Sequence, residues 1–269
     1  MKRIAHLTLA LMLMVGLGKI QATDGAHSMN IKAIIFDCDG ILVDSEYAHY
    51  LAWQHALQQE GGDLTIEEYY SYVGKSVETN AKLLAEKIGS THVDRIMENK
   101  RKFYHILQNE GLPAIEHVVN FVRRLAKDKQ KYGFKLGVAS AAKKNEILIN
   151  LRNLEIDKYF DIVISGYDDL SHYSDPEGVN KPKPYIYLHV AKALGFLPYE
   201  CVVIEDSLSG VTSGVNAGCI TIAVPNDYTR HQDLSTANVK LDSFAKITSY
   251  EDFLLMLTSI PDSTEDKSP

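Results

Sequence analysis

The apolar and polar positions of the chain first form a clear pattern at Ile34-Ile35-Phe36, a run of β-branched and aromatic residues. Asp37-Cys38-Asp39-Gly40 follows it directly. An apolar run bounded by Asp and Gly predicts a buried parallel strand that leads into a tight loop. Two carboxylates at the tip of such a strand are costly unless a cation, a proton or a reacting group compensates them. The alternative is an ordinary strand-end turn, in which Asp37 caps the loop and Asp39-Gly40 makes the bend.

Residues 45 to about 112 carry helical periodicity throughout. Tyr50, Trp53 and Leu57 lie at helical spacing, and Gly61-Gly62 ends that segment. Thr65-Ile66-Glu67-Glu68 has the form of a capping box. Two more apolar stripes end at glycines: Val77, Leu84 and Ile88 before Gly89, and Val93, Ile96, Met97, Tyr104 and Leu107 before Gly111. The pattern predicts a helical insertion, without strands, directly after the acidic strand.

From Pro113 onward, predicted strands and helices alternate. Apolar strands that alternate with helices indicate a parallel sheet covered on both faces. The sequence therefore predicts an α/β fold, a Rossmann-like parallel sheet core with an inserted all-helical cap. The expected strands are Leu136–Ala139, Ile162–Ile164, Cys201–Glu205 and Ile220–Val224; the expected helices are Val118–Leu125, Asn145–Leu154, Pro184–Leu194 and Leu208–Ala217.

These patterns divide the chain into a core of residues 29–44 and 114–250 and a cap of residues 45–113. Residues 251–269 are expected to form a C-terminal helix and a disordered tail. Residues 1–28 are expected to be a leader or a signal-like extension, because Met1-Lys2-Arg3 precedes a short apolar stretch that ends at Gly18. That stretch is too short for a membrane span, and Met29 is an alternative start.

Composition and charge narrow the function. The apolar fraction is 45% and the charged fraction 23%, as in ordinary globular proteins. A net charge of −7 and a pI near 5.8 argue against a nucleic-acid surface. Cys38, Cys201 and Cys219 lack metal-type spacing and adjoin predicted strands, so we expect buried reduced thiols. We expect a cytoplasmic monomer with no stable membrane association; export to the periplasm through residues 1–22 is the alternative.

The residues that can carry chemistry lie where the predicted strands end. The carboxyl ends of parallel strands converge on one edge of the sheet, so we expect these residues to lie together. Besides Asp37 and Asp39, three further motifs lie there: Ser140-Ala141, Asn180-Lys181-Pro182-Lys183-Pro184, and Glu205-Asp206-Ser207. Carboxylates are the ligands that Mg²⁺ prefers, and a lysine with backbone amides neutralises phosphoryl oxygens. One carboxylate of the first pair can attack phosphorus while the other protonates the leaving oxygen. Together the residues predict a Mg²⁺ and phosphate site.

Each of these motifs also has a purely structural interpretation. Ser140 could be a helix N-cap and Lys181 a loop lysine. Glu205-Asp206-Ser207 could simply begin a helix whose glycines, Gly210 and Gly214, allow close packing. The functional interpretation requires that all the motifs share one edge of the sheet.

With these motifs in this order, the chain resembles the haloacid dehalogenase-like hydrolase superfamily, in the helical-cap branch, and is similar to β-phosphoglucomutase-like phosphatases. The resemblance covers roughly residues 31–243. It implies that Asp37 is the nucleophile and a Mg²⁺ ligand, and that Asp39 is the general acid/base and lends its backbone carbonyl to the metal. It implies that Ser140, with Ala141 behind it, and Lys181 hold the phosphoryl group. Asp206 would complete the metal site, with Glu205 as a ligand or an outer partner, and the acidic strand would be central in the sheet.

The presence of Asp39 favours phosphate chemistry over dehalogenation, because the dehalogenases of the family lack this second aspartate. We expect a phosphatase acting on a small phosphorylated metabolite such as a sugar phosphate. A phosphosugar mutase of the β-phosphoglucomutase type is the alternative, and a catalytically silent binding protein is the non-enzymatic one. Substrate contacts should come from the cap, where Lys75 and His49 match family positions. The β-phosphoglucomutases usually have an arginine at the position of Lys75, which favours the phosphatase. The structural alternative for His49 is that it is only a half-buried polar residue at the hinge.

Overall fold

A computed structural model describes residues 30–73 and 75–258. The expectations for residues 1–28 and for the tail at 261–269 lie outside this range. None of the helices within the described residues combines the length and the hydropathy that crossing a membrane would require.

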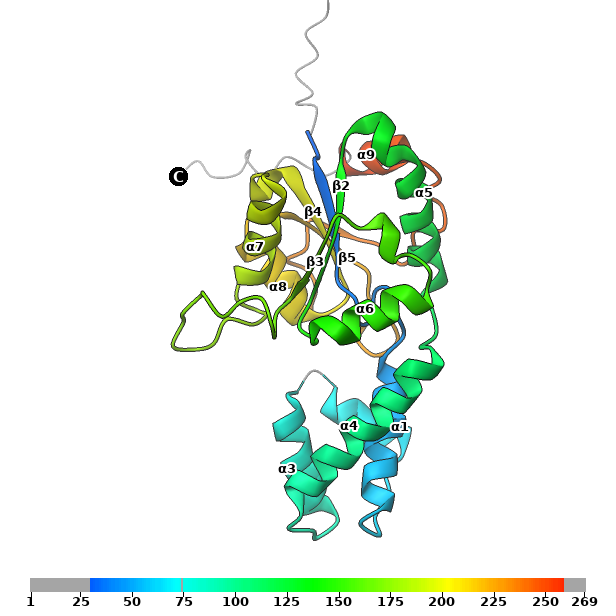
Figure 1. Ribbon diagram of the computed structural model, residues 1–269, viewed down its shortest axis with the longest axis vertical. Helices are drawn as coiled ribbons and strands as arrows, with labels where there is room; N and C mark the ends of the chain where they lie inside the picture. The colour runs from blue at the N-terminus through cyan, green and yellow to red at the C-terminus, as the bar shows by residue number, and fades with distance from the viewer. Residues whose placement is uncertain (1–29, 74, 259–269) are drawn as a thin grey trace, which may run out of the picture.

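A parallel sheet of six strands, in the order β3-β2-β1-β4-β5-β6, forms the centre of the core (Figure 1). The acidic strand β1 is central, which confirms the expectation. The four predicted later strands are present, with ends that differ from the prediction by at most one residue. The sequence missed β6, because two residues are too few to carry a period. The strands are β1 Ala33–Phe36, β2 Lys135–Ser140, β3 Ile162–Ser165, β4 Cys201–Glu205, β5 Ile220–Ala223 and β6 Val239–Lys240.

Helices cover both faces of this sheet (Figure 1). Alternate residues of β1 point to opposite faces, so Ile34 and Phe36 enter one apolar cluster and Ala33 and Ile35 the other. The first cluster lies under α5, α6 and α9. The second lies mainly under α7, with α8 on the same side of the sheet. The core helices are α5 Glu116–Tyr132, α6 Lys144–Asn153, α7 Tyr185–Leu194, α8 Leu208–Asn216 and α9 Tyr250–Thr258, with 3₁₀ turns η2 Asp157–Tyr159 and η3 Pro198–Glu200.

Between β1 and α5 the described residues form helices joined by turns and loops, with isolated bridges at Val43 but no strand, as the periodicity predicted. Thr65 and Glu68 make the expected capping box. The insert has an apolar cluster of its own around Trp53, Leu57 and Leu84. We propose on this basis that residues 45–113 form a separate cap domain. Its helices are α1 Glu46–Gln58, α2 Ile66–Tyr69, α3 Val77–Lys87 and α4 Val93–Glu110, with the 3₁₀ turn η1 Tyr70–Tyr72.

Two chain crossings join this cap to the core. They run side by side: Asp44 N–H donates to the Pro113 carbonyl at 2.8 Å, and Ile115 N–H donates to the Leu42 carbonyl at 3.0 Å. Beside them, the buried Gln108 of α4 donates from Nε2 to Asn150 Oδ1 of α6 at 2.9 Å. Buried amides need partners, so this contact helps to fix where the cap stands over the carboxyl end of the sheet.

Candidate active site

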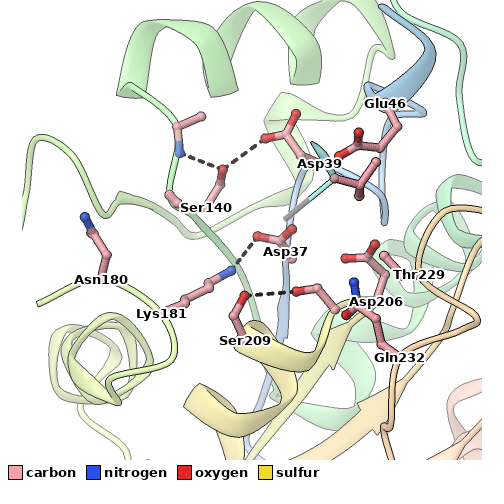
Figure 2. Close-up of a pocket in the computed structure, with 14 residues that line it drawn as sticks. Asp37, Asp39, Glu46, Ser140, Asn180, Lys181, Asp206, Ser209, Thr229 and Gln232 are labelled. Atoms are coloured by element: carbon pink, nitrogen blue, oxygen red, sulfur yellow. Dashed lines mark hydrogen bonds and ion pairs between the residues drawn. The ribbon is translucent and has the colours of Figure 1, made fainter. Parts of the chain in front are cut away.

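The strand register brings the predicted motifs to one edge. Phe36 is paired with Val138 on β2 and with Ile204 on β4. Asp37 therefore lies one residue past this level, and Ser140 and Asp206 lie two residues past it. A cavity of about 250 Å³ opens there, lined by Asp37, Asp39, Ser140, Ala141, Lys181 and Asp206 among others (Figure 2).

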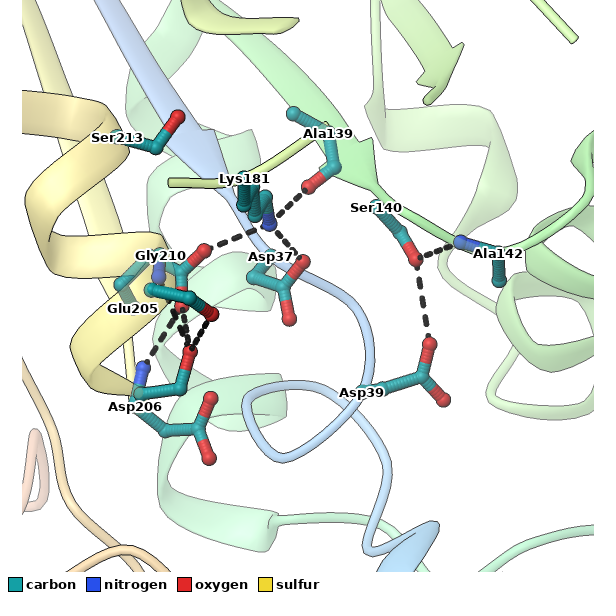
Figure 3. A network of polar contacts seen from close by, with 12 residues as sticks. Asp37, Asp39, Ala139, Ser140, Ala142, Lys181, Glu205, Asp206, Gly210 and Ser213 are labelled. Atoms are coloured by element: carbon teal, nitrogen blue, oxygen red, sulfur yellow. Dashed lines mark hydrogen bonds and ion pairs between the residues drawn. The ribbon is translucent and has the colours of Figure 1, made fainter. Parts of the chain in front are cut away.

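Lys181 is a buried cation at the bottom of this site, with its side chain 9% exposed. Its Nζ lies 2.6 Å from Asp37 Oδ1 and 2.6 Å from Glu205 Oε1, and it donates to the Ala139 carbonyl at 3.1 Å (Figure 3). Lys181 does lie in a loop, as the structural alternative held, but its side chain is buried and paired with two carboxylates of the site. The stiff loop before α7 brings Lys181 under the sheet edge.

Glu205 is fully buried and serves as the counterion that holds this lysine. Its Oε1 also accepts the Tyr187 hydroxyl at 2.6 Å, and its Oε2 accepts the Asp206 amide at 3.1 Å. A Cβ on Gly210 would come within 1.9 Å of the Glu205 carboxyl carbon, so this turn of α8 needs a glycine. The helix-start interpretation is correct in part, because Ser207 caps α8 by accepting the Gly210 amide. Glu205 does not line the cavity.

Asp39 and Ser140 lie next to each other in the lining of the cavity. The Ser140 hydroxyl donates to Asp39 Oδ2 at 3.2 Å and accepts the Ala142 amide at 3.1 Å (Figures 2 and 3). The N-cap alternative for Ser140 is wrong, because α6 begins only at Lys144. Burial raises the pKa of Asp39, and the Ser140 hydrogen bond acts in the opposite direction. A carboxyl group with a raised pKa is suited to carry a proton.

The residues present fit a divalent cation. One carboxylate oxygen each from Asp37, Glu205 and Asp206 lies within 4.8 Å of the others, and all three residues are buried. Burial, opposed by Lys181, raises the pKa of Asp37 to about 8. Burial and the neighbouring carboxylates of Glu205 and Asp37 raise the pKa of Asp206 well above its usual value. One lysine does not balance this negative charge, and a hard cation with oxygen ligands would.

The two cap residues predicted to bind substrate, His49 and Lys75, do not line the cavity beside Asp37. His49 lines a neighbouring cavity of about 460 Å³, which shares Asp39, Ala141 and Ala142 with the first cavity. Lys75 is exposed, donates to the Ser71 carbonyl and lines neither of these two cavities. It lines a third cavity, of about 230 Å³, together with His49 and Lys100. His49 therefore lines a cavity with Asp39, whereas Lys75 lines one with His49 but not with Asp39.

Lys100 on α4 is a residue that the sequence did not single out. It is 5% exposed, and its Nζ lies 3.0 Å from His49 Nδ1 and 4.7 Å from the Tyr104 ring centre. Burial lowers the pKa of Lys100 to about 8. The only signal in the sequence was its place in a basic run on an amphipathic helix, which usually indicates a solvated face.

Comparisons with known proteins place the chain in a family. Residues 34–224 match the sequence model of a family described as haloacid dehalogenase-like hydrolase. The phosphorylated carbohydrates phosphatase of Thermotoga maritima is 30% identical over 193 residues, which make up 70% of this chain and 82% of that protein.

Two solved structures extend the likeness to the whole fold. The β-phosphoglucomutase of Clostridium difficile has a TM-score of 0.63 at 27% identity, with 85% of this chain and 97% of that one covered. CbbY from Rhodobacter sphaeroides, solved in complex with phosphate, has a TM-score of 0.65 at 25% identity, with coverages of 82% and 98%. The protein with this buried acidic site under a helical cap belongs to the haloacid dehalogenase-like hydrolases.

Proposed function

We propose that this hydrolase is a Mg²⁺-dependent phosphatase that acts on a small phosphorylated metabolite, a sugar phosphate or a similar compound. The observation that carries the proposal is the pairing of Lys181 with Asp37 at 2.6 Å beside a cavity that Asp39 and Ser140 also line. The name of the Thermotoga maritima relative, a phosphatase of phosphorylated carbohydrates, supports the substrate class.

In this proposal the Asp37 carboxylate attacks phosphorus, and an aspartyl phosphate forms as the bond to the leaving oxygen breaks. Asp39 gives its proton to that oxygen. A water molecule then attacks the same phosphorus and passes a proton to Asp39. The bond between phosphorus and the Asp37 oxygen breaks, so phosphate is released and the Asp37 carboxylate is restored. Ser140, the Ala141 amide and Lys181 hold the phosphoryl oxygens.

Asp37, Asp206 and the Asp39 carbonyl would hold Mg²⁺. When bound, the ion would neutralise charge on the transferring phosphoryl group. The four hydrogen bonds that Glu205 accepts, from Lys181, Tyr187, the Asp206 amide and the Ser207 hydroxyl, favour a role beside the ligands rather than as one of them.

A phosphosugar mutase is the second candidate, and the likeness to a β-phosphoglucomutase supports it. In the phosphatase, water accepts the phosphoryl group, and in the mutase a sugar hydroxyl accepts it. The chemistry of the core residues is the same in both. Lys75 stands at the cap-loop position where mutases usually carry arginine, and this difference favours the phosphatase. A silent binding protein would have no need of the complete set Asp37, Asp39, Lys181 and Asp206.

The first experiment measures phosphate release from p-nitrophenyl phosphate by the purified chain, with Mg²⁺ and with a chelator. We expect release with Mg²⁺ only. The same preparation is then given β-glucose 1-phosphate. Free phosphate as the product supports the phosphatase, whereas glucose 6-phosphate without free phosphate would establish the mutase. A preparation that binds p-nitrophenyl phosphate with Mg²⁺ but releases no phosphate would support the binding protein.

We propose that Lys100, which lines a cavity with Asp39 and His49, donates to a substrate oxygen. Lys100→Met is therefore expected to raise KM for a sugar phosphate by about tenfold, because a hydrogen bond to a charged group contributes about 1.5–3 kcal/mol. Its Tm should equal or exceed that of the wild type, because the change removes a buried charge. With the pKa of Lys100 at about 8, the ammonium is charged below pH 8. The wild-type KM should therefore rise above pH 8, and that rise should be absent in the variant.

Lys102→Met, on the same helix and 68% exposed, is the matched control and should change neither KM nor Tm. Steady-state kinetics across pH and thermal melts provide the measurements. An unchanged KM together with a lower Tm in Lys100→Met would show that Lys100 only supports the cap.

A further inference from the structure

The loop between β5 and β6 places an asparagine against the acidic site. Asn226 donates from Nδ2 to Asp206 Oδ2 at 2.8 Å and to the Gly40 carbonyl at 3.3 Å. Gly40 belongs to the loop after β1, and Asp206 to the loop after β4. A single amide therefore ties together the two loops that carry the carboxylates.

The orientation of the Asn226 amide is determined by its other partners. Its Oδ1 accepts the amides of Tyr228 at 2.9 Å and Thr229 at 3.1 Å, and the Thr229 hydroxyl at 3.2 Å. Its own backbone N–H donates to the Thr229 hydroxyl at 3.1 Å. Because three donors surround Oδ1, Nδ2 is the end that faces Asp206.

Gly40 packs against the same carboxylate oxygen. It has a φ of +81°, and a Cβ there would lie 2.5 Å from Asp206 Oδ2 and 3.0 Å from Asn226 Nδ2. Asp206 Oδ2 is thus enclosed by the Gly40 backbone and by the Asn226 amide. In the described part of the chain, the side-chain hydrogen bonds to this carboxylate go to Oδ2, which leaves Oδ1 for a cation.

We propose that Asn226 is a positioning residue of the divalent metal site, which orients Asp206 so that Oδ1 faces the cation. The proposal rests on the metal role of Asp206 under the proposed function. Partners that orient a ligand carboxylate typically change metal affinity or activity by about 10–100-fold. Asn226 itself does not line the cavity beside Asp37, so it should act on the metal rather than on the substrate.

Two variants separate the donor from the acceptor of this amide. Asn226→Ala removes both, whereas Asn226→Asp retains an oxygen for the three loop donors and replaces only the Nδ2 donor. Isothermal titration of the full-length protein with Mg²⁺, without substrate, measures Kd. Asn216→Ala, at an exposed asparagine that ends α8, is the matched control.

We expect the Kd for Mg²⁺ to rise about tenfold or more in Asn226→Ala. It should also rise in Asn226→Asp, although the added negative charge alone would lower it. Excess Mg²⁺ should return kcat with p-nitrophenyl phosphate close to the wild-type value in both variants. Asn216→Ala should bind Mg²⁺ as the wild type does.

Wild-type affinity for Mg²⁺ in Asn226→Ala, or tighter binding in Asn226→Asp, would overturn the role of Asn226 but not the proposed metal site. Loss of kcat that saturating Mg²⁺ does not restore, with Kd unchanged, would show a general structural role and would also overturn it. Wild-type protein that binds no Mg²⁺ would overturn the proposed metal site and this role with it.

Discussion

Asp37→Asn is expected to reduce kcat for phosphate release by on the order of 10⁴-fold or more, because an amide cannot attack phosphorus as the carboxylate does. The fold should survive the change. Burial raises the pKa of Asp37 to about 8, so ionising this group in the metal-free fold is unfavourable at neutral pH. Asn has nearly the same shape, and Lys181 keeps Glu205 as a partner at 2.6 Å. We expect a Tm no lower than that of the metal-free wild type.

The measurement is phosphate release at saturating Mg²⁺, with rapid-quench mass spectrometry to detect a phosphorylated Asp37 in the wild type. Asp227→Asn makes the same chemical change at an exposed aspartate that lies outside the cavity beside Asp37, and it should leave kcat unchanged. Wild-type turnover by Asp37→Asn would refute the nucleophile role.

Lys181→Met is expected to have the largest effect on stability. It would leave Asp37 and Glu205 buried side by side without their shared cation, since Lys181 lies 2.6 Å from each. Removing one partner of a buried ion pair typically costs about 3–5 kcal/mol in the free energy of unfolding. Activity should also fall, because the lysine would no longer neutralise the phosphoryl oxygens.

The loss should depend on pH with a definite sign. An aspartate whose folded pKa lies above the unfolded value destabilises the fold as pH rises from the unfolded pKa toward the folded one. Without Lys181, which lowers the pKa of Asp37, this window widens. The wild-type carboxyl of Asp37 ionises in the fold near pH 8, whereas in the variant it stays protonated to a higher pH, so the part of the stability difference that comes from Asp37 should grow as pH rises above 8.

Urea unfolding without metal, at several pH values, measures this difference. Lys192→Met removes an exposed lysine of α7 and should change stability by no more than about 0.5 kcal/mol. A Lys181→Met protein as stable as the wild type at pH 8 would contradict the view that this lysine compensates buried charge. Added Mg²⁺ should restore part of the lost stability if the acidic cluster binds it.

Much of the fold and part of the site follow from the order of the residues. The apolar runs and the helical stripes are local signals. They predicted the helical insert and every strand of the sheet except the shortest. The parallel topology then places residues that follow different strands at one edge, as Phe36 paired with Val138 and Ile204 demonstrates. For this reason Asp37, Ser140 and Asp206 could be grouped before the structure was known.

The rest was decided by contacts between residues far apart in the chain. Tyr187 holds Glu205 across 18 positions and Asn226 reaches Gly40 across 186, and no local pattern reports such pairs. Lys100 and Lys75 both lie in polar stretches of the cap, yet one is buried against His49 and the other is exposed. Side-chain burial depends on what packs over a helix, which its own periodicity does not specify. The sequence by itself determined the two carboxylates at the tip of the central strand, whereas only the tertiary structure decided which groups hold, charge and orient them.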